Sequence, residues 1–568
     1  MKKIMECPAA GENASAAVSA AVMALSDGDT LCLQNGRYDF YPEGAYRKEY
    51  YISNNDSGVK SIAFPLIGKK NIVIDGGGAE LVFHGRILPF AVDGSENITI
   101  RDLSVDYAAP FYAQAKITEA DTHHTTLFFE KPDFSCRVEN GNFCFYSETD
   151  GWENRVEQAL ALEFSWNADR TAGIPSPFLP PYFPYSGPKK DHGFLGGMFR
   201  DVKLEQLDEN RIVMYMETPH VHTVGNYLVM THSDRCYPGF FLTHAKNVTL
   251  SGIRLYHSAS MGVIAQCSED ITLDTVTAKP RPGSGRMLSV NADATHFVNC
   301  RGSIVMRNCT FVSMMDDACN IHGIYGLYRE RKQENVISVS FGHGQQKGID
   351  FCRVGDTVAV IDSEQTKTLM TAAVTKQELL SPEEYILTLD RAVPVPGKHY
   401  VIENLSTAPD VHITDCESGN NRPRGFLLST AGRVLVERCT FYNMSQGIQL
   451  GGEMRDWYES GAVKDVTIRD NDFADSAFAG GYAITIVPSL REEDARMPFH
   501  GTVVIENNRF TQAEPRMLFC RLTEKLVFRK NTFIRDTSLP SHPIGQKDGI
   551  CIDRDTCTEV LVDGNTVV

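Results

Sequence analysis

Three aspartates stand at intervals that could bring their carboxylates together. Asp293 closes the tripeptide Asn291-Ala292-Asp293, and Asp316 follows it by 23 positions with Asp317 next to it. Like charges held close together raise the pKa of at least one carboxyl, which keeps a general acid protonated near neutral pH. A protonated and an ionised carboxyl together suit the cleavage of a glycosidic bond. The apolar context VSMMDDACNI makes two buried acids too costly for a turn alone.

The spacing leaves the stereochemistry of such a reaction open. Carboxyl groups about 5 Å apart imply retention, whereas roughly 6.5–9.5 Å leaves room for a water and gives inversion. Rungs of a β-structure stack about 4.8 Å apart, so a pair on neighbouring rungs fits either case. In a regular strand, Asp316 and Asp317 would point to opposite faces. Both can face one cleft only where the chain bends or bulges.

Other residues near this stretch could contact a substrate. His322 is a structural or substrate-contacting imidazole rather than a metal ligand, because no second His or Cys stands at metal spacing. Arginines can donate several hydrogen bonds to sugar hydroxyls, although solvated surface arginines are an equal alternative. The candidates of this kind are Asn291, Arg422, Arg424, Arg286, Gln446, Glu453 and Trp457, whose ring could stack on a sugar.

A Ca²⁺ site is another use of carboxylates and asparagine oxygens. It would need more oxygen ligands than these motifs supply, so we expect no metal and no cofactor.

Short alternating segments recur along the chain and predict a coil repeat. Segments such as NVTLSGIRLYHS and RVLVERCTFYN alternate apolar and polar residues and then turn at Asp, Asn or Gly. Their starts at 247 and 270, 410 and 433, and 502 and 525 are each 23 residues apart. Period-2 alternation indicates strands, and these turn residues tolerate left-handed backbone conformations. The pattern predicts an all-β, right-handed parallel β-helix, because neither a leucine-rich signature nor propeller-length blades appear.

Two stretches interrupt the repeat and read as inserted β-barrel or β-sandwich domains. An amphipathic helix near Ala14 to Leu25 is expected to cap the first coil rather than serve as a signal peptide. The predicted organisation is an N-terminal cap and first coils at 1–107, an inserted β-rich domain at 108–236, coils with the aspartates at 237–324, an inserted barrel-like domain at 325–405, and C-terminal coils at 406–568.

Composition limits the classes of partner that the protein is expected to bind. The chain has 55 Lys and Arg against 72 Asp and Glu, a net charge of -17. This charge repels phosphate backbones and anionic lipid, so we expect neither nucleic acid nor a membrane as partner. The 15 cysteines lack CxxC spacing and suggest buried free thiols in a reducing compartment, the cytoplasm, although a leader could have been removed. An exposed insertion could support a homodimer.

The order Asn-x-Asp, then Asp-Asp, then His-Gly resembles the active site of polygalacturonase-type β-helix glycosidases, where three aspartates carry inverting hydrolysis. The Arg-x-Lys element with which that pattern ends has no equivalent here. Over essentially the whole chain, including ECPAAGENASAAVSAAV, NADATHF and MMDDACNIHG, the sequence is more similar to glycoside hydrolase family 110.

That resemblance implies an inverting, metal-independent α-1,3-galactosidase that removes terminal α-galactose from blood group B antigens, linear glycans or both. It matches Asp316 to the general acid, and Asp293 and Asp317 to the carboxylates that hold and deprotonate water. Which of Asp316 and Asp317 is the acid stays open. The alternatives are a pectin-type hydrolase or lyase and a noncatalytic carbohydrate-binding β-helix. The three aspartates and the negative charge disfavour a lyase, which needs a basic residue.

Overall fold

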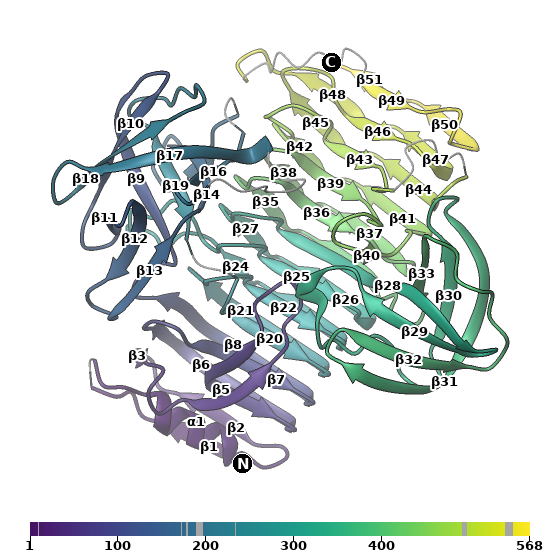
Figure 1. Ribbon diagram of the computed structural model, residues 1–568, viewed down its shortest axis with the longest axis horizontal. Helices are drawn as coiled ribbons and strands as arrows, with labels where there is room; N and C mark the ends of the chain where they lie inside the picture. Colours follow the sequence, from purple (N-terminus) through teal and green to yellow (C-terminus); the bar gives the residue numbers. More distant parts are fainter. Residues whose placement is uncertain are drawn as a thin grey trace.

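The computed structural model describes residues 1–568 except residues 10, 172, 178–179, 189–196, 233–234, 491–496 and 540–548. Its body is a stack of parallel coils that runs from the N-terminus to the C-terminus, with two inserted β-domains at opposite sides of the view in Figure 1. Within the described residues, no helix has the length and apolar character needed to cross a bilayer.

One ladder of parallel strands carries the strands on which the candidate site is built. Each strand pairs with the strand one coil further on, and the apolar side chains of alternate residues fill the interior. Its members are β5 (Gly58–Ile67), β7 (Leu88–Asp93), β20 (Phe240–Thr243), β22 (Val263–Gln266), β25 (Thr295–Val298), β28 (Cys319–Gln333), β36 (Arg424–Leu428), β39 (Gln446–Leu450), β43 (Ile484–Ile486), β46 (Leu518–Cys520) and β49 (Ile550–Ile552).

A second ladder forms the other wall, with long strands in the first coils and two shorter strands per coil later on. Its members include β1 (Lys2–Met5), β2 (Thr30–Leu33), β3 (Arg37–Phe40), β6 (Lys70–Phe83), β8 (Glu96–Tyr107), β21 (Lys246–Leu255), β23 (Glu269–Asp274), β24 (Thr277–Ala278), β26 (Arg301–Arg307), β27 (Thr310–Val312), β34 (Asp410–Thr414), β35 (Glu417–Gly419), β37 (Arg433–Glu437), β38 (Thr440–Tyr442), β41 (Asp465–Arg469), β42 (Asp472–Ala474), β44 (His500–Glu506), β45 (Arg509–Gln512), β47 (Thr523–Arg529), β48 (Thr532–Arg535), β50 (Glu559–Asp563) and β51 (Thr566–Val567).

The predicted period of 23 residues is confirmed by the strand register. Val248 pairs with Ile271, and Val411 pairs with Val434. The pairs at 502 and 525 are likewise in register. Longer intervals are the same coil with a larger loop, as where Val434 pairs with Val466.

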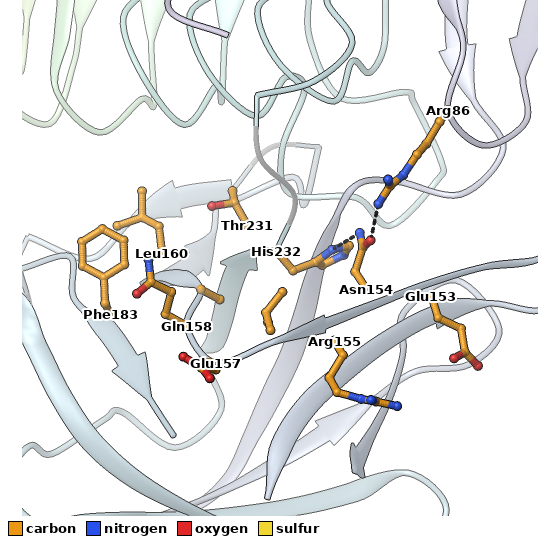
Figure 2. Close-up of a pocket in the computed structure, with 12 residues that line it drawn as sticks. Arg86, Glu153, Asn154, Arg155, Glu157, Gln158, Leu160, Phe183, Thr231 and His232 are labelled. Carbon is orange, nitrogen blue, oxygen red and sulfur yellow. Dashed lines mark hydrogen bonds between the residues drawn. The ribbon is translucent and has the colours of Figure 1, made fainter. Parts of the chain in front are cut away.

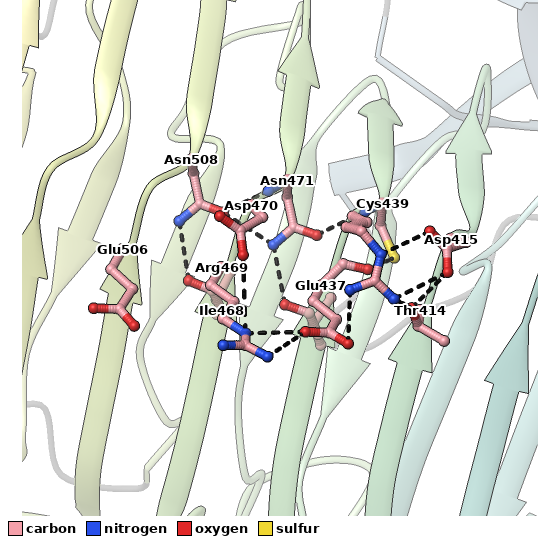
Figure 3. Close-up of polar contacts among 12 residues, drawn as sticks. Thr414, Asp415, Glu437, Cys439, Ile468, Arg469, Asp470, Asn471, Glu506 and Asn508 are labelled. Atoms are coloured by element: carbon pink, nitrogen blue, oxygen red, sulfur yellow. Dashed lines mark hydrogen bonds and ion pairs between the residues drawn. The ribbon is translucent and has the colours of Figure 1, made fainter.

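The polar turns behave as the sequence predicts. Corner residues of successive coils adopt left-handed backbone conformations with φ between 53° and 57°, and they include Asn308, Asp415, Arg438, Asp470 and Asn507. Asn and Asp tolerate this conformation best, and the arginine is the exception. Ion pairs between neighbouring coils line the same edge (Figure 3).

Behind this corner, a column of buried asparagines links the C-terminal coils (Figure 3). The Oδ1 of Asn508 accepts hydrogen bonds from the backbone N–H and the Nδ2 of Asn471, at 3.0 and 2.9 Å. Asn531 and Asn565 repeat the arrangement on the next coils. Each Nδ2 also donates to a backbone carbonyl of the preceding coil, as from Asn508 to Ile468 at 3.0 Å. The ladder satisfies polar groups that the interior would otherwise leave unpaired.

The N-terminal helix α1 (Ser15–Met23) is slightly shorter than the predicted one. Val18 and Val22 are buried in the main core, and the Oγ of Ser19 donates to the carbonyl of Ala63 on β5 at 3.0 Å. The helix therefore covers the apolar interior where the coil stack begins, at the lower left of Figure 1.

The first insertion forms two sheets that share a core, and all their strand pairs are antiparallel except β16 with β17. The larger consists of β9 (Tyr112–Ala120), β10 (His124–Phe129), β14 (Leu160–Trp166), β15 (Gly173–Pro175), β16 (Phe183–Tyr185), β17 (Phe199–Gln206), β18 (Arg211–Met216) and β19 (Tyr227–Thr231), and the smaller of β11 (Ser135–Glu139), β12 (Asn142–Ser147) and β13 (Trp152–Val156).

The second insertion is a closed six-stranded barrel that shares a strand with the coils. The β28 strand pairs with β25 and β36 at its start and with barrel strands at its end. The predicted boundary between 324 and 325 therefore falls inside one continuous strand. The other barrel strands are β29 (Val336–Phe341), β30 (Thr357–Asp362), β31 (Lys367–Ser381), β32 (Glu384–Leu389) and β33 (Tyr400–Asn404).

Candidate active site

The three aspartates meet where neighbouring strands begin. Asp293 precedes β25 and Asp317 precedes β28, and the N–H of Ala294 donates to the carbonyl of Asp317 at 2.9 Å. Each of the three side chains offers a carboxylate oxygen within 4.8 Å of the others. The chain bends between β27 and β28. The side chains of Asp316 and Asp317 therefore do not have to point to opposite faces, as neighbouring residues of a regular strand do. The Nδ2 of the buried Asn421 holds this bend by donating to the carbonyl of Asp316 at 2.8 Å.

Three guanidinium groups contact two of the three carboxylates. Nη2 of Arg235 donates to Asp316 at 2.6 Å, and Nη2 of Arg422 lies 3.5 Å from the other oxygen of the same carboxylate. Arg424 donates to Asp317 from Nη2 at 2.6 Å and from its backbone N–H at 3.1 Å. Asp293 alone of the three aspartates has an imidazole rather than an arginine as its hydrogen-bonded partner among the described residues.

These neighbours give the carboxyl groups different proton affinities. Burial and the nearby Asp316 charge raise the pKa of Asp293 to about 8. Burial also raises the pKa of Asp317 well above its usual range, although Arg424 opposes this effect. Burial would raise the pKa of Asp316 as well, but Arg422 and Arg235 outweigh it and hold that pKa below its usual range. In the unliganded site, Asp316 is therefore ionised, whereas both Asp293 and Asp317 favour the protonated form.

A hydrogen-bonded series of two histidines, His296 and His322, extends inward from Asp293. Nδ1 of His322 donates to the carbonyl of Gly323 at 2.6 Å, so its Nε2 accepts from Nε2 of His296 at 2.9 Å. Nδ1 of a neutral His296 is then an acceptor, and it lies 2.5 Å from Oδ2 of Asp293. Burial lowers the pKa of His296 to about 4, which keeps this ring neutral. The hydrogen-bond directions thus place a proton on Asp293, in agreement with its raised pKa.

Glu459, on the short strand β40 (Glu459–Ser460), closes the far side of this series. Its Oε1 lies 3.5 Å from Nε2 of His322 and its Oε2 accepts from Nδ2 of Asn320 at 3.4 Å. His296, His322 and Glu459 form a group that could hold a metal ion, as could the three aspartates. Hydrogen bonds between the histidines and from the arginines already engage these atoms, which disfavours an ion at either place.

Asp316 faces an open cavity of about 570 Å³ at the junction of the coils and both insertions. The cavity is lined by Asn55, Asp56, Ser57, Leu160, Thr231, Arg235, Ala259, Asn291, Met315, Asp316, Gly344, Gln345, Lys347 and Trp457. The Oδ1 of Asn291 is buried without a hydrogen-bond partner in the described part of the chain. An unpartnered acceptor next to a polar cavity is available to a ligand hydroxyl.

Trp457 supplies an aromatic surface to this cavity. Its ring packs against His343 of the barrel, with centroids 4.3 Å apart, and the Arg235 guanidinium lies 5.9 Å from the ring centroid. About a third of the side chain remains exposed (36 %). The arrangement leaves ring area free for a sugar to pack on.

Glu453 does not reach the cavity lining, although the sequence proposed it as a substrate contact. Its carboxylate accepts hydrogen bonds from the four consecutive backbone N–H groups of residues 455–458. These contacts hold the turn that presents Trp457. Glu453 is therefore a positioning residue for the aromatic surface.

Arg286 and Gln446 are likewise not among the cavity residues. Arg286 donates to Asp106 at 2.8 Å and to the carbonyls of Tyr107 and Ala108, so it ties the start of the first insertion to the coils. Gln446 begins β39 in register with Arg424, two coils beyond the coil that carries Asp316 and Asp317.

Sequence reasoning missed four residues of the site: Arg235, His296, Glu459 and His343. His296 stands three positions after Asp293, a local signal that could have identified it. The other three reach the site through contacts across 80 or more residues, or from the barrel, and carry no local signal.

Comparison with known proteins agrees with this architecture. Residues 336–397 match the family model "GLAA-B beta-barrel domain II", and residues 401–568 match "Right handed beta helix region". "Alpha-1,3-galactosidase A" of Shewanella woodyi is 34 % identical over 521 residues, which cover 90 % of this chain and 81 % of that protein. "Alpha-1,3-galactosidase B" of Bacteroides thetaiotaomicron is 30 % identical, covering 95 % and 86 %. "Alpha-1,3-galactosidase B" of Phocaeicola vulgatus is 33 % identical, covering 91 % and 86 %.

The fold, the carboxylate site and these relatives together define the class of the protein: it is a glycosidase built on a right-handed β-helix. Identities of 30 % or more over most of both chains identify the family as well. The chain belongs to the α-1,3-galactosidase family that its sequence resembles, glycoside hydrolase family 110.

Proposed function

We propose that the protein is an exo-acting α-galactosidase that releases terminal α-1,3-linked galactose from linear Galα1-3Gal glycans, blood group B type glycans or both. The convergence of Asp293, Asp316 and Asp317 beside one open cavity is the observation that carries the proposal. The names of its relatives support the substrate, and the partly exposed ring of Trp457 offers a surface for the galactose ring.

The proposed reaction is a single displacement with inversion at the anomeric carbon. Asp316 protonates the glycosidic oxygen, because it is the aspartate that lines the cavity. Asp293 and Asp317 hold the attacking water and take its proton. Their raised pKa values make them strong proton acceptors once they are ionised.

The acid role requires a change at Asp316 when substrate binds. In the unliganded site Arg235 and Arg422 favour its ionised form. A glycosidic oxygen can take the place of the Arg235 guanidinium at Oδ2, which weakens this stabilisation and lets Asp316 accept a proton. Asp293, which carries a proton in the unliganded site, lies within reach as its source.

The distance between the carboxylates makes the stereochemistry a decisive measurement. One oxygen of each carboxylate lies within 4.8 Å of the others, and because these are selected atoms, the carboxyl groups as a whole can lie further apart. Separations of about 5 Å give retention and roughly 6.5–9.5 Å give inversion. Inversion is proposed from the resemblance to polygalacturonase-type sites, and the alternative is retention, in which one aspartate would attack the sugar directly.

Proton NMR of the anomeric signals during hydrolysis of a Galα1-3Gal disaccharide tests the proposal, with Asp316→Asn as the inactive control. β-Galactose appearing first, and no turnover by the variant, is the expected result. If α-galactose appears first, the hydrolase stands but the water-activating roles of Asp293 and Asp317 are wrong. No release of galactose by the unaltered protein, either from this disaccharide or from a branched blood group B trisaccharide, would overturn the proposed activity.

A further inference from the structure

A second cavity, of about 660 Å³, lies on the first insertion next to the candidate active site. It is formed by β13, residues 157–160, the start of β16, the end of β19 and one arginine from the coils (Figure 2). Its lining residues are Arg86, Glu153, Asn154, Arg155, Val156, Glu157, Gln158, Ala159, Leu160, Phe183, Thr231 and His232. Its volume is within the range of pockets that hold small ligands.

The two cavities share part of their walls. Leu160 and Thr231 line both the second cavity and the one that contains Asp316 and Trp457. The two cavities therefore adjoin at these two residues. An exo-acting enzyme holds the terminal sugar at its acid and must accommodate the rest of the glycan on the other side of the cleaved bond.

Three side chains of the second cavity are held in a fixed hydrogen-bonded chain. Nη2 of Arg86 donates to Oδ1 of Asn154 at 2.7 Å, so the Nδ2 of Asn154 donates to Nδ1 of His232 at 3.2 Å. His232 packs between Phe145 and Trp152, with ring centroids 4.4 and 5.6 Å away. Burial lowers the pKa of His232 to about 3, so the ring is neutral and accepts at Nδ1.

The hydrogen bond to Asn154 orients the Arg86 guanidinium and leaves most of its N–H donors without a partner among the described residues. A guanidinium has five N–H donors, and one of them has a partner among the described residues. The side chain is exposed to the cavity while its orientation is set from behind by Asn154 and His232. A preorganised donor of this kind binds hydroxyl oxygens with little loss of conformational entropy.

The charges of the lining balance and indicate a neutral ligand. Arg155 pairs with Glu139 outside the cavity, and Glu153 pairs with Arg137 at 2.7 Å. Gln158 and Thr231 add neutral hydrogen-bonding groups. Phe183 adds an aromatic ring, which suits the apolar face of a sugar.

We propose that this second cavity is the leaving-group subsite, which binds the uncharged saccharide units on the far side of the cleaved galactosidic bond through Arg86, Asn154 and Phe183. The inference rests on the proposed galactosidase function and deepens it. It makes the first insertion, rather than the coils, the part that selects among glycans carrying the same terminal galactose.

Kinetics with two substrates that share the galactose but differ in leaving group test this proposal. One is 4-nitrophenyl α-galactoside, and the other is the trisaccharide Galα1-3Galβ1-4GlcNAc. We expect Arg86→Ala to lower kcat/KM for the trisaccharide about tenfold, as for the loss of one charge-assisted hydrogen bond, and to change the aryl galactoside less than about twofold. Phe183→Ala should show the same selectivity, which guards against a folding defect specific to one variant.

Arg211→Ala is a matched control, because Arg211 lies on β18 of the same insertion, pairs with Asp208 and is not part of either cavity lining. This control should change kcat/KM for neither substrate. The subsite proposal would be overturned if both cavity variants lost kcat/KM equally on the two substrates, or if neither lost kcat/KM on the trisaccharide. Failure of the unaltered protein to release galactose from both of these substrates and from a branched blood group B trisaccharide would instead overturn the proposed function, so the two failures are distinguishable.

Discussion

Nη2 of Arg235 donates a 2.6 Å hydrogen bond to Oδ2 of Asp316, across 81 positions of the chain. The arginine follows the first insertion, and the aspartate stands at the bend before β28. The same guanidinium lies 5.9 Å from the ring centroid of Trp457. One side chain therefore joins the proposed acid, the aromatic surface and the insertion that carries the second cavity.

Replacing Arg235 with Gln should raise the pKa of Asp316, because an opposite charge favours the ionised carboxylate. If Asp316 is the general acid, it then stays protonated to higher pH, and the alkaline limb of the kcat/KM profile moves upward. Profiles of the variant and the unaltered protein on 4-nitrophenyl α-galactoside measure this change. Arg422→Gln should move the limb in the same direction. An unchanged alkaline limb in both variants would contradict the acid role of Asp316.

Asp293→Asn should change how stability depends on pH. The folded-state pKa of Asp293 is about 8, against a usual value of 3.8. A raised folded-state pKa means that the folded protein holds this proton more tightly than the unfolded chain. The resulting contribution to the free energy of unfolding is fully present below about pH 4 and is lost as the pH rises through about 8. The loss is about 1.4 kcal/mol for each pH unit between the two pKa values. The neutral asparagine removes this dependence. Its Tm relative to the unaltered protein should therefore increase from about pH 5 to about pH 9, measured by calorimetry. A constant difference would show that Asp293 is ionised throughout.

Glu453→Ala should weaken substrate binding through Trp457. The substitution removes the acceptor of four backbone N–H groups in the turn 455–458, so the indole loses its fixed position. We expect KM to rise about five- to tenfold, as for the loss of roughly 1 kcal/mol of aromatic stacking, with kcat nearly unchanged. Trp457→Ala should raise KM to a similar extent. The double variant should be no worse than Trp457→Ala alone, and additive effects would refute the positioning role.

Asn508→Ala tests the asparagine column. Its side chain is almost fully buried and exchanges hydrogen bonds with Asn471, Ile468 and Asn531. The substitution leaves buried donors and acceptors unpaired, and we expect a loss of about 2–4 kcal/mol in the free energy of unfolding, measured by urea denaturation. Asn565→Ala, at the partly exposed last rung, is the matched control and should lose less. Equal losses at both positions would show that burial does not set the contribution of a rung.

Local patterns were sufficient for the coils and for the aspartates. The 23-residue period follows from side chains that alternate inward and outward, and each coil must satisfy the same geometry. Asp293 and Asp316 share that period, so their proximity could be predicted, and the bend that lets Asp317 join them could be stated as a requirement. Arg422 and Arg424 could be proposed because their coil follows the aspartates directly.

Other parts of the site depend on contacts that no short segment encodes. Arg235 reaches Asp316, and Glu459 reaches His322, from distant parts of the chain, and their residue types are common on any surface. From the sequence, Glu453 is a candidate substrate contact only as a polar side chain that could hydrogen-bond sugar hydroxyls, like the arginines. Its actual role is to accept hydrogen bonds from the four backbone N–H groups of the turn 455–458. The conformation of that turn is visible only in the three-dimensional structure.

The shared strand β28 makes the barrel inseparable from the catalytic coil. It runs for 15 residues, a length of roughly 50 Å when extended. Residues 319–321 pair with β36, residues 323–324 with β40 and residues 325–327 with β33, so its pairing passes from the coils to the barrel without a flexible joint. The barrel is thus not a cassette that could be excised or exchanged between relatives at a loop. A cut after residue 324 would leave His322 two residues from a free chain end.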